Sequence, residues 1–190
     1  MKRIVGLTGL AGSGKTTVAH WLIGRFDFEP FAFADPLKDG VATMLGIPRE
    51  WMDDQERKQA ILPQYGCTLR HVLQTIGTEW GRRCVHEDIW LIRAREILSA
   101  RKASTVIHDV RFGNEAVMVR SMGVLVHVVR DGHAGLDGSA GRHVSEAGVR
   151  IAPEDIVIHN CGDLDDLHAV LEYQFRFLKS KVRTCPSRQR

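Results

Sequence analysis

The sequence predicts an α/β protein with a doubly wound, five-stranded parallel sheet. Apolar runs suited to buried strands alternate with segments of helical spacing along the 190 residues. The first apolar run leads into a Gly-rich stretch and then a helix, an order typical of phosphate-binding loops. Apolar residues make up 44% of the chain and charged residues 26%, as in ordinary globular domains. We therefore expect a single domain over 1–190 with a sizeable core.

The phosphate-binding loop is predicted at Gly9–Thr16, which fits G-x-x-x-x-G-K-[ST]. An apolar strand over 4–7 and a helix over about 15–25 give the context that this motif requires. The glycines allow the loop N–H groups and the helix N-terminus to face a phosphate. Lys15 is expected to reach the β- and γ-phosphates, and the Thr16 hydroxyl to ligate Mg²⁺. A Gly-rich turn with a chance Lys-Thr pair is the plainer alternative, and the motif and its context together disfavour it.

The remaining elements follow from apolar spacing along the chain. A second strand is expected at 31–34, and Pro36 suits the start of the next helix because its missing N–H costs nothing there. The stretch 49–66 is polar and is expected to be irregular. Further helices are predicted from near Thr68, over about 87–101, from 111–115 to about 122, and from 164 to 178. Further strands are predicted at 104–109, 124–130 and 155–160.

Charged residues follow several of the predicted strands. The carboxyl ends of parallel strands share one edge of a sheet. We therefore expect the phosphate loop, Asp35, Asp109 and Arg130 to lie together at that edge. An Asp after a buried strand in such a protein usually holds Mg²⁺, directly or through water. Asp109 is therefore the predicted metal partner of Thr16, and capping of the next helix is its plainer role.

Composition excludes several functional classes. Four scattered cysteines form no C-x-x-C pair, which indicates neither a zinc site nor a disulfide framework and fits a reducing cytoplasm. No stretch approaches the ~20 apolar residues of a membrane span, and the run at 4–7 is too short for a signal peptide. The net charge of +3 lies partly in the basic tail that begins at Lys179. This tail is expected to be a solvated end rather than a stable nucleic-acid-binding segment.

The remaining features favour a small-molecule kinase. The chain lacks the N-K-x-D segment of GTPases, and motor ATPases are generally longer. Transfer between two anions needs cations around the transferred group and the exclusion of water. The segment about 131–150 has no apolar period and is predicted to be a lid. Its Gly-rich part, 131–142, contains a single arginine, Arg142. Arg111 and Arg130 are therefore preferred as the cations nearest the transferred phosphate.

Several blocks of the chain resemble the deoxynucleoside monophosphate kinases of tailed phages. They are Phe33-Ala34-Asp35-Pro36-Leu37-Lys38, the stretch 69–79 (L-R-x-x-L-Q-x-x-G-T-E), Asp88-Ile89-Trp90, the stretch 109–115 (D-V-R-F-x-N-E) and His143-Val144-Ser145-Glu146. The resemblance covers residue 3 to about 175. It implies a P-loop NTPase fold of the adenylate-kinase type, with a helical acceptor-binding region over about 36–100 and a lid. It also implies ATP and Mg²⁺ as cofactors and a deoxynucleoside monophosphate as acceptor.

The resemblance assigns a role to each matching residue. The ATP phosphates would be held by Ala11, Gly12, Ser13, Gly14, Lys15, Thr16 and Thr17. Asp35 and Lys38 would lie beside the acceptor phosphate, and Arg70 would grip it as a fork. The acceptor base or sugar would be lined by Gln74, Gly77, Thr78, Glu79 and Arg82. Arg111 would approach the transferred phosphate, and Arg130 would act from the hinge of the lid.

Plainer roles exist for several of these residues. Lys38 could be a solvated helix residue, and Gln74 and Thr78 could only satisfy backbone groups. Trp80 and Trp90 are expected in the core rather than stacked on a base.

The predicted chemistry is direct in-line transfer, catalysed by Lys15, Arg111 and Arg130 through positioning and charge neutralisation. One alternative is another small phosphate-loop kinase, of the dephospho-coenzyme A or phosphomevalonate type. The other is a nucleotide-binding regulatory protein that does not catalyse. The base accepted, the preference for deoxyribose over ribose, and a homodimer are left open by the sequence.

Overall fold

The computed structural model describes residues 2–130 and 149–179 and divides the chain into two compact units. One unit comprises Met1–Pro30 and Ser104–Arg190, and the other comprises Phe31–Ala103. Most of the predicted lid, including Arg142 and the block 143–146, lies outside the described residues. No helix in the described part of the chain is long and apolar enough to cross a membrane.

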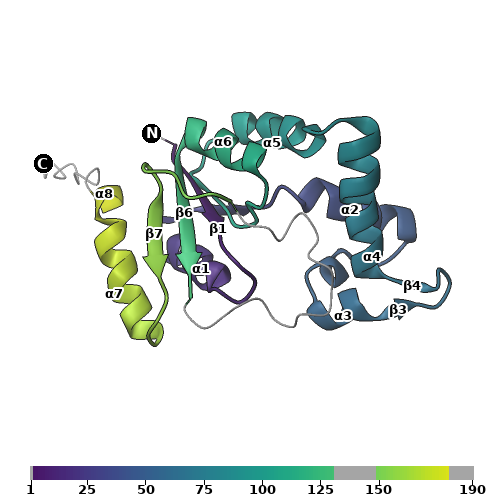
Figure 1. Cartoon of the computed structure of the whole chain (residues 1–190), viewed down its shortest axis with the longest axis horizontal. Helices are drawn as coiled ribbons and strands as arrows, with labels where there is room; N and C mark the ends of the chain where they lie inside the picture. The colour runs from purple at the N-terminus through teal and green to yellow at the C-terminus, as the bar shows by residue number, and fades with distance from the viewer. Residues whose placement is uncertain (1, 131–148, 180–190) are drawn as a thin grey trace, which may run out of the picture. The chain divides into compact units, whose positions relative to one another are not determined.

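A five-stranded sheet forms the centre of the first unit, with the strand order β2-β5-β1-β6-β7 (Figure 1). β1 pairs in parallel with both β5 and β6, and β6 pairs in parallel with β7. The registers place Val5 opposite both Val106 and Val124. The predicted doubly wound parallel sheet is therefore confirmed. Its strands are β1 (Ile4–Thr8), β2 (Glu29–Phe31), β5 (Thr105–Ile107), β6 (Val124–Val129) and β7 (Ile156–His159).

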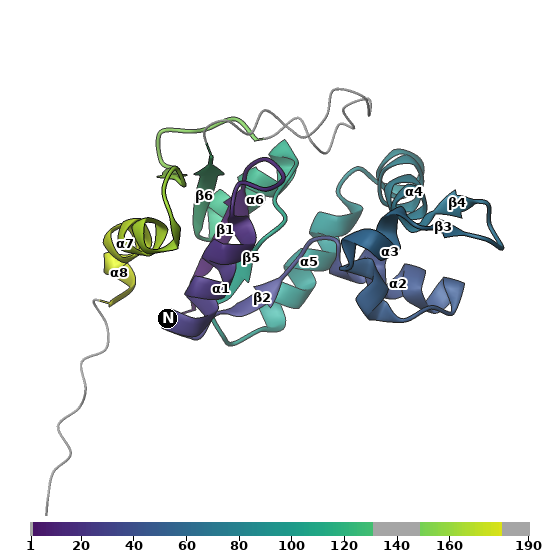
Figure 2. The same ribbon diagram turned by 90° about the horizontal axis from the view of Figure 1, so that it is seen from below.

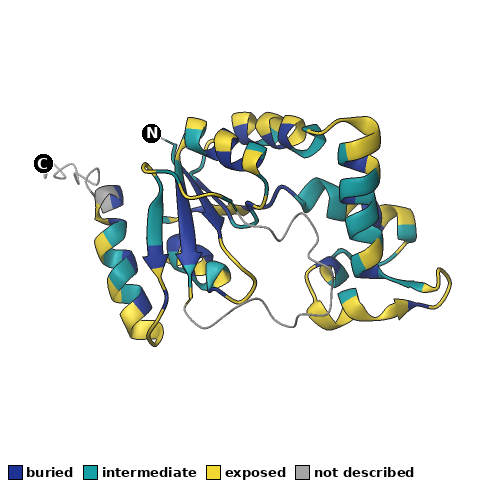
Figure 3. Ribbon diagram, viewed as in Figure 1, coloured by how far each residue is buried: buried dark blue, intermediate teal, exposed yellow. Residues whose placement is uncertain are grey.

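Helices cover both faces of this sheet. On one face, α1 (Lys15–Phe26) and α7 (Leu164–Gln174) pack on a buried cluster that includes Leu7, Leu22 and Leu171. On the other face lies α6 (Gly113–Met122), so that α1 and α6 flank β1 from opposite sides (Figure 2). The short α8 (Arg176–Lys179) follows α7. β1 is buried along its whole length and β6 over most of it, so these two strands form the centre of the core (Figure 3).

A buried ion pair anchors the start of β7. Asp155 accepts hydrogen bonds from Arg120 Nε at 2.9 Å, from Arg120 Nη2 at 2.6 Å and from the N–H of Ala152 at 2.8 Å. His127 Nε2 lies 2.9 Å from the same carboxylate. The hydrogen bonds from Arg120 hold the pKa of Asp155 well below its usual range. These contacts tie α6 and β6 to the residue that precedes β7.

The second unit is mostly helical. Its elements are α2 (Asp35–Leu45), the 3₁₀ helix η1 (Arg49–Met52), α3 (Gln55–Gln59), β3 (Ile61–Leu62), β4 (Cys67–Thr68), α4 (Leu69–Gln74), the π-helix η2 (Thr75–Val85) and α5 (Ile89–Ala100). Its core gathers Val41, Met52, Leu62 and Leu69, so η1 and the β3–β4 hairpin both contribute to it. The unit overlaps the predicted acceptor-binding region of 36–100, whose role stays a prediction.

The second strand lies earlier than expected. β2 ends at Phe31, although the apolar residues Ala32 and Phe33 are buried as well. The N–H of Ala32 donates to Asp35 Oδ2 at 2.8 Å, which turns the chain toward α2. The apolar run therefore marked burial rather than continued strand pairing.

Two further expectations for the second unit were wrong. The stretch 49–66 is not irregular, because it contains η1, α3 and the antiparallel pair β3–β4. Trp80 is 53% exposed instead of buried in the core. Trp90 is half-buried, and its Nε1–H donates to the carbonyl of Gly77 at 2.8 Å.

Candidate functional site

The phosphate-binding loop lies between β1 and α1, as its motif requires. Gly12 and Gly14 adopt φ values of +77° and +105°, a region that L side chains rarely enter. α1 then begins at Lys15, so its first N–H groups follow the loop directly. The positive end of the helix dipole thus lies at the loop, where it favours an anion.

Ser13 gives a second indication of an anion site. Its side chain is buried, and its Oγ has no hydrogen-bond partner among the described residues. A buried hydroxyl without a partner carries a desolvation cost, which a phosphate oxygen bound in the loop would offset. The residues of this loop therefore fit the phosphates of ATP.

The Lys15 side chain is held against the loop by hydrogen bonds from its ammonium group. Its Nζ donates to the carbonyls of Gly9 at 2.8 Å and Leu10 at 2.7 Å. Burial lowers the pKa of Lys15 to about 8, and the positive charge of Arg111 acts in the same direction. The N–H of Val110 donates to the carbonyl of Leu7 at 3.2 Å, so the segment that carries Arg111 lies beside the end of β1, close in sequence to the loop that carries Lys15.

Arg111 is positioned by a buried carboxylate. Glu115 Oε2 accepts the N–H of Arg111 at 2.7 Å and the N–H of Phe112 at 3.0 Å, at the start of α6. Glu115 is buried, whereas the Arg111 side chain is exposed. The backbone beneath Arg111 is thus fixed while its guanidinium can reach a ligand.

Asp109 and Arg130 follow the strands on either side of β1. Asp109 comes two residues after β5 and is half-buried, and Arg130 directly follows β6 and is exposed. Because both strands run parallel to β1, these residues and the loop lie toward one edge of the sheet. Asp35 belongs to the second unit, so its place at that edge stays a prediction.

Thr16 and Asp109 provide the donors that Mg²⁺ prefers. Thr16 is exposed in the first turn of α1. The described residues contain no cluster of three His, Cys, Asp or Glu side chains able to hold a metal. Mg²⁺ in phosphoryl-transfer sites usually takes one or two protein ligands plus phosphate and water, so this donor set fits it.

In the second unit, the predicted acceptor residues Asp35 and Lys38 belong to a network of charges. Asp35 Oδ1 lies 3.0 Å from Arg49 Nη2 and 4.0 Å from Lys38 Nζ. Lys38 Nζ lies 2.7 Å from Asp53 Oδ1, and the Lys38 side chain is only 16% exposed. Lys38 is therefore not the freely solvated helix residue of the plainer interpretation.

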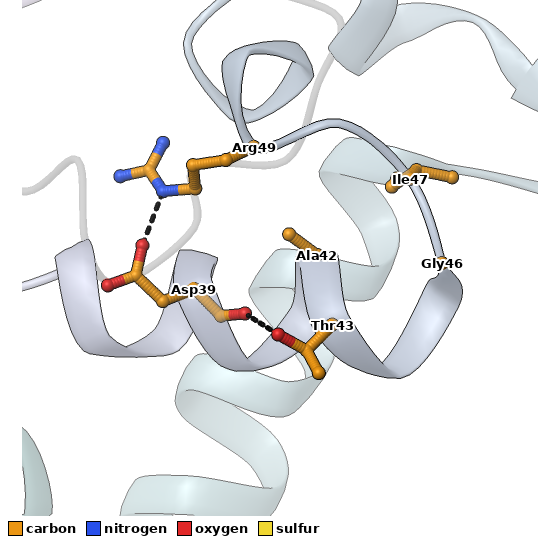
Figure 4. A pocket seen from close by; sticks show the side chains of 6 residues that line it. All are labelled: Asp39, Ala42, Thr43, Gly46, Ile47 and Arg49. Atoms are coloured by element: carbon orange, nitrogen blue, oxygen red, sulfur yellow. Dashed lines mark hydrogen bonds and ion pairs between the residues drawn. The ribbon is translucent and has the colours of Figure 1, made fainter.

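Arg49 is the centre of this network. Besides Asp35, its guanidinium contacts Asp39 at 2.6 Å through Nε and Asp53 at 2.6 Å through Nη1. Although burial works in the opposite direction, hydrogen bonds from Lys38 and Arg49 lower the pKa of Asp53. Arg49 and Asp39 also line an open hollow of about 330 Å³ beside α2 (Figure 4).

The other predicted acceptor residues lie on α4 and η2. Arg70 is half-buried and donates to Gln55 Oε1 at 3.0 Å. Gly77 is buried, whereas Gln74 and Thr78 are half-buried. Glu79 forms an ion pair with Arg83 at 2.9 Å, and Arg82 Nη1 donates to the carbonyl of Glu87 at 3.1 Å. Their contacts with an acceptor stay predictions.

Sequence reasoning missed three residues that support these sites. Arg49 lies in the stretch expected to be irregular, and Asn160 was assigned only to the fifth strand. Asn160 Nδ2 donates to the carbonyl of Ser13 at 2.9 Å. Glu115 ends the D-V-R-F-x-N-E block, and its place at the third position of α6 was a signal for a helix cap.

Comparison with known proteins agrees with this geometry. The family model for deoxynucleotide monophosphate kinase matches residues 50–171. A protein of Acanthamoeba polyphaga mimivirus, assigned as a deoxynucleotide monophosphate kinase, is 34% identical over 87% of this chain and 92% of its own length. The deoxynucleoside-5'-monophosphate kinase of Escherichia phage T5 is 28% identical over 63% of this chain and 72% of its own.

A solved structure shares the fold. TT1252 from Thermus thermophilus superposes with a TM-score of 0.50 at 19% identity, over 93% of this chain and 98% of that one. The phosphate loop, the parallel sheet and the family match over more than half of the chain support one assignment: the chain belongs to the deoxynucleotide monophosphate kinase family.

Proposed function

We propose that this kinase transfers the γ-phosphate of ATP to the phosphate of a deoxynucleoside monophosphate, giving ADP and the deoxynucleoside diphosphate. The observation that carries the proposal is the meeting of two chain segments at the phosphate loop. Lys15 begins α1 there, and the N–H of Val110, the residue before Arg111, donates to the carbonyl of Leu7 at 3.2 Å. Cations at this edge of the sheet would both be stabilised by an anion bound in the loop. Phosphoryl transfer needs this arrangement, because negative charge spreads over the transferred group.

In the proposed mechanism, each residue binds, orients or neutralises. The loop N–H groups hold the β- and γ-phosphates, and Lys15 and Arg111 neutralise the transferred group. Thr16 and Asp109 would hold Mg²⁺, which supplies further positive charge to the phosphate oxygens. The acceptor phosphate is already an anion, so the bond to the γ-phosphorus forms as the bond to the ADP oxygen breaks, without a general base.

The second unit is proposed to hold the acceptor. Arg70 would bind the acceptor phosphate, with Asp35 and Lys38 beside it, and the acceptor base or sugar would contact Gln74, Gly77, Thr78, Glu79 and Arg82. The π-helical geometry of η2 supports this proposal, since π-helical segments occur often at functional sites. Arg130 would approach the transferred phosphate from the end of β6.

The family match does not favour the other two functions that the sequence left open. These were a kinase of the dephospho-coenzyme A or phosphomevalonate type and a regulatory protein that binds nucleotide without catalysis.

A coupled assay of ATP consumption tests the proposal. The acceptors are dAMP, dGMP, dCMP, dTMP and their ribose counterparts, each with and without Mg²⁺. We expect metal-dependent turnover of at least one deoxynucleotide. Lys15→Ala and Arg111→Ala should lower kcat by about 100-fold or more, because each removes a cation from the transferred phosphate. Their thermal unfolding should change little.

Arg25→Ala is the matched control, because it removes an exposed cation that pairs with Glu172. If the wild-type protein binds ATP but phosphorylates none of the deoxynucleotides, the proposed acceptor is contradicted. Undiminished turnover in Lys15→Ala would contradict the proposed catalytic role.

A further inference from the structure

Asn160 lies directly after β7 and supports the phosphate loop. Its Nδ2 donates to the Ser13 carbonyl at 2.9 Å, and its backbone N–H donates to the carbonyl of Val129 at 2.7 Å. Asn160 is only 7% exposed, so water competes little for its amide. Asn160 thus connects the phosphate loop to the end of β6, which Arg130 directly follows.

The hydrogen bond orients one peptide group of the loop. In a planar trans peptide, the carbonyl of Ser13 and the N–H of Gly14 point in opposite directions. Because Asn160 draws the carbonyl toward itself, the Gly14 N–H is directed to the other side. A reversed peptide would turn a carbonyl oxygen toward the bound phosphate, where like partial charges repel.

The contact with Gly14 is also close. A Cβ atom on Gly14 would lie 2.5 Å from Asn160 Nδ2, a separation that real Cβ contacts do not show. The glycine therefore serves two purposes, since it permits the φ of +105° and leaves room for the Asn160 amide. The loop and the end of β7 fit each other at this point.

We infer that Asn160 is a positioning residue for ATP, whose side-chain amide aims the Gly14 N–H at the phosphates. This inference deepens the proposed function, since it rests on ATP binding at this loop. It does not depend on which acceptor receives the phosphate.

The test measures ATP affinity by isothermal titration calorimetry for wild type, Asn160→Asp and His159→Gln. Asn160→Asp preserves the side-chain shape but replaces the donor with a carboxylate that repels the Ser13 carbonyl. We expect its Kd for ATP at about pH 8 to rise about tenfold or more. His159 is the exposed neighbour of Asn160, so His159→Gln should leave the Kd unchanged. The KM for the acceptor at saturating ATP should stay within about twofold in both variants.

A pH series separates this role from a general structural one. Protonation of the carboxyl group that Asn160→Asp introduces gives the side chain an O–H donor, so ATP affinity of this variant should recover toward wild type as pH falls. Asn160→Ala has neither donor nor charge; it should lose ATP affinity without such recovery, and it replaces Asn160→Asp if that variant does not fold.

An unchanged Kd for ATP in a folded variant, with only a lower melting temperature, would overturn the inference. Failure of wild type to phosphorylate any deoxynucleotide would contradict the proposed function instead. The comparison of ATP affinities would still decide the role of Asn160.

Discussion

At the scale of single residues, Lys15 is the most perturbed group of the candidate site. Burial lowers its pKa to about 8, and Arg111 adds to the shift. The protonated amine binds phosphate, so the free protein loses this cation as the pH rises through about 8. A bound phosphate reverses the shift, because it favours the charged amine. ATP binding and proton uptake by Lys15 are therefore linked.

Arg111→Ala tests this linkage through its pH dependence. Removing the positive charge should raise the pKa of Lys15, although burial will still keep it below the ordinary lysine value of 10.5. The alkaline loss of ATP affinity should therefore move to higher pH, whatever the absolute affinity of the variant. Titration of a fluorescent ATP analogue between about pH 7 and 10 measures the midpoint. Arg25→Ala should leave that midpoint in place, and an unmoved midpoint in Arg111→Ala would contradict the coupling of the two cations.

At the scale of elements, the Arg49 network connects η1 to α2. One guanidinium contacts carboxylates on Asp35, Asp39 and Asp53, a geometry that a lysine ammonium cannot reproduce. The side chains of Arg49 and Asp35 are each 33% exposed, so solvent screens part of the attraction. The network therefore fixes the direction of the chain after α2 more than it adds to stability.

Arg49→Lys should lower the free energy of unfolding by about 1 kcal/mol, since the ion pairs are partly exposed. Urea unfolding at low and high salt is the measurement, and the difference from wild type should shrink at high salt. Arg93→Lys is the control, because Arg93 makes an exposed pair with Glu96. Equal effects of the two variants would show that the network adds nothing beyond isolated surface pairs.

The elements also show what a sequence can reveal. β1, the phosphate loop and α1 were predictable because their signals are local: an apolar run, glycines at fixed spacing and a helical period. The β3–β4 hairpin was not, because strands of two residues carry no alternation. Asn160 and Ser13 are 147 positions apart, so only the folded sheet shows their contact. Asp35 and Asp39 share one helix, but only the turn after α2 brings Arg49 and Asp53 to them.

At the scale of the whole molecule, the two units are proposed to divide the substrates. The first carries the phosphate loop, Asp109 and Arg111, and the second carries the residues assigned to the acceptor. The second unit is one continuous stretch, Phe31–Ala103, inserted between two parts of the first. If the division is right, ATP contacts backbone amides of the first unit and the deoxynucleoside monophosphate contacts backbone amides of the second.

Hydrogen exchange tests this division. ATP should protect amides at 9–17 and 109–112, because it orders the phosphate loop and the segment that leads into α6. A deoxynucleoside monophosphate alone should protect amides at 35–53 and 70–82. Mass spectrometry of peptic peptides resolves the two sets, with α7 as an internal reference that neither ligand should protect. Protection of 35–53 by ATP alone would contradict the division.

The order of strands in the sheet has a consequence for synthesis of the chain. β1 leaves the ribosome well before its neighbours in the sheet, β5 and β6, with Ile4 opposite Thr105 and Val5 opposite Val124. At ~5–20 residues per second, the partners follow roughly 5–20 s later. The whole of Phe31–Ala103 emerges in that interval. β1, which leads into the phosphate loop, therefore cannot pair with either neighbour until the segment assigned to the acceptor has already been made.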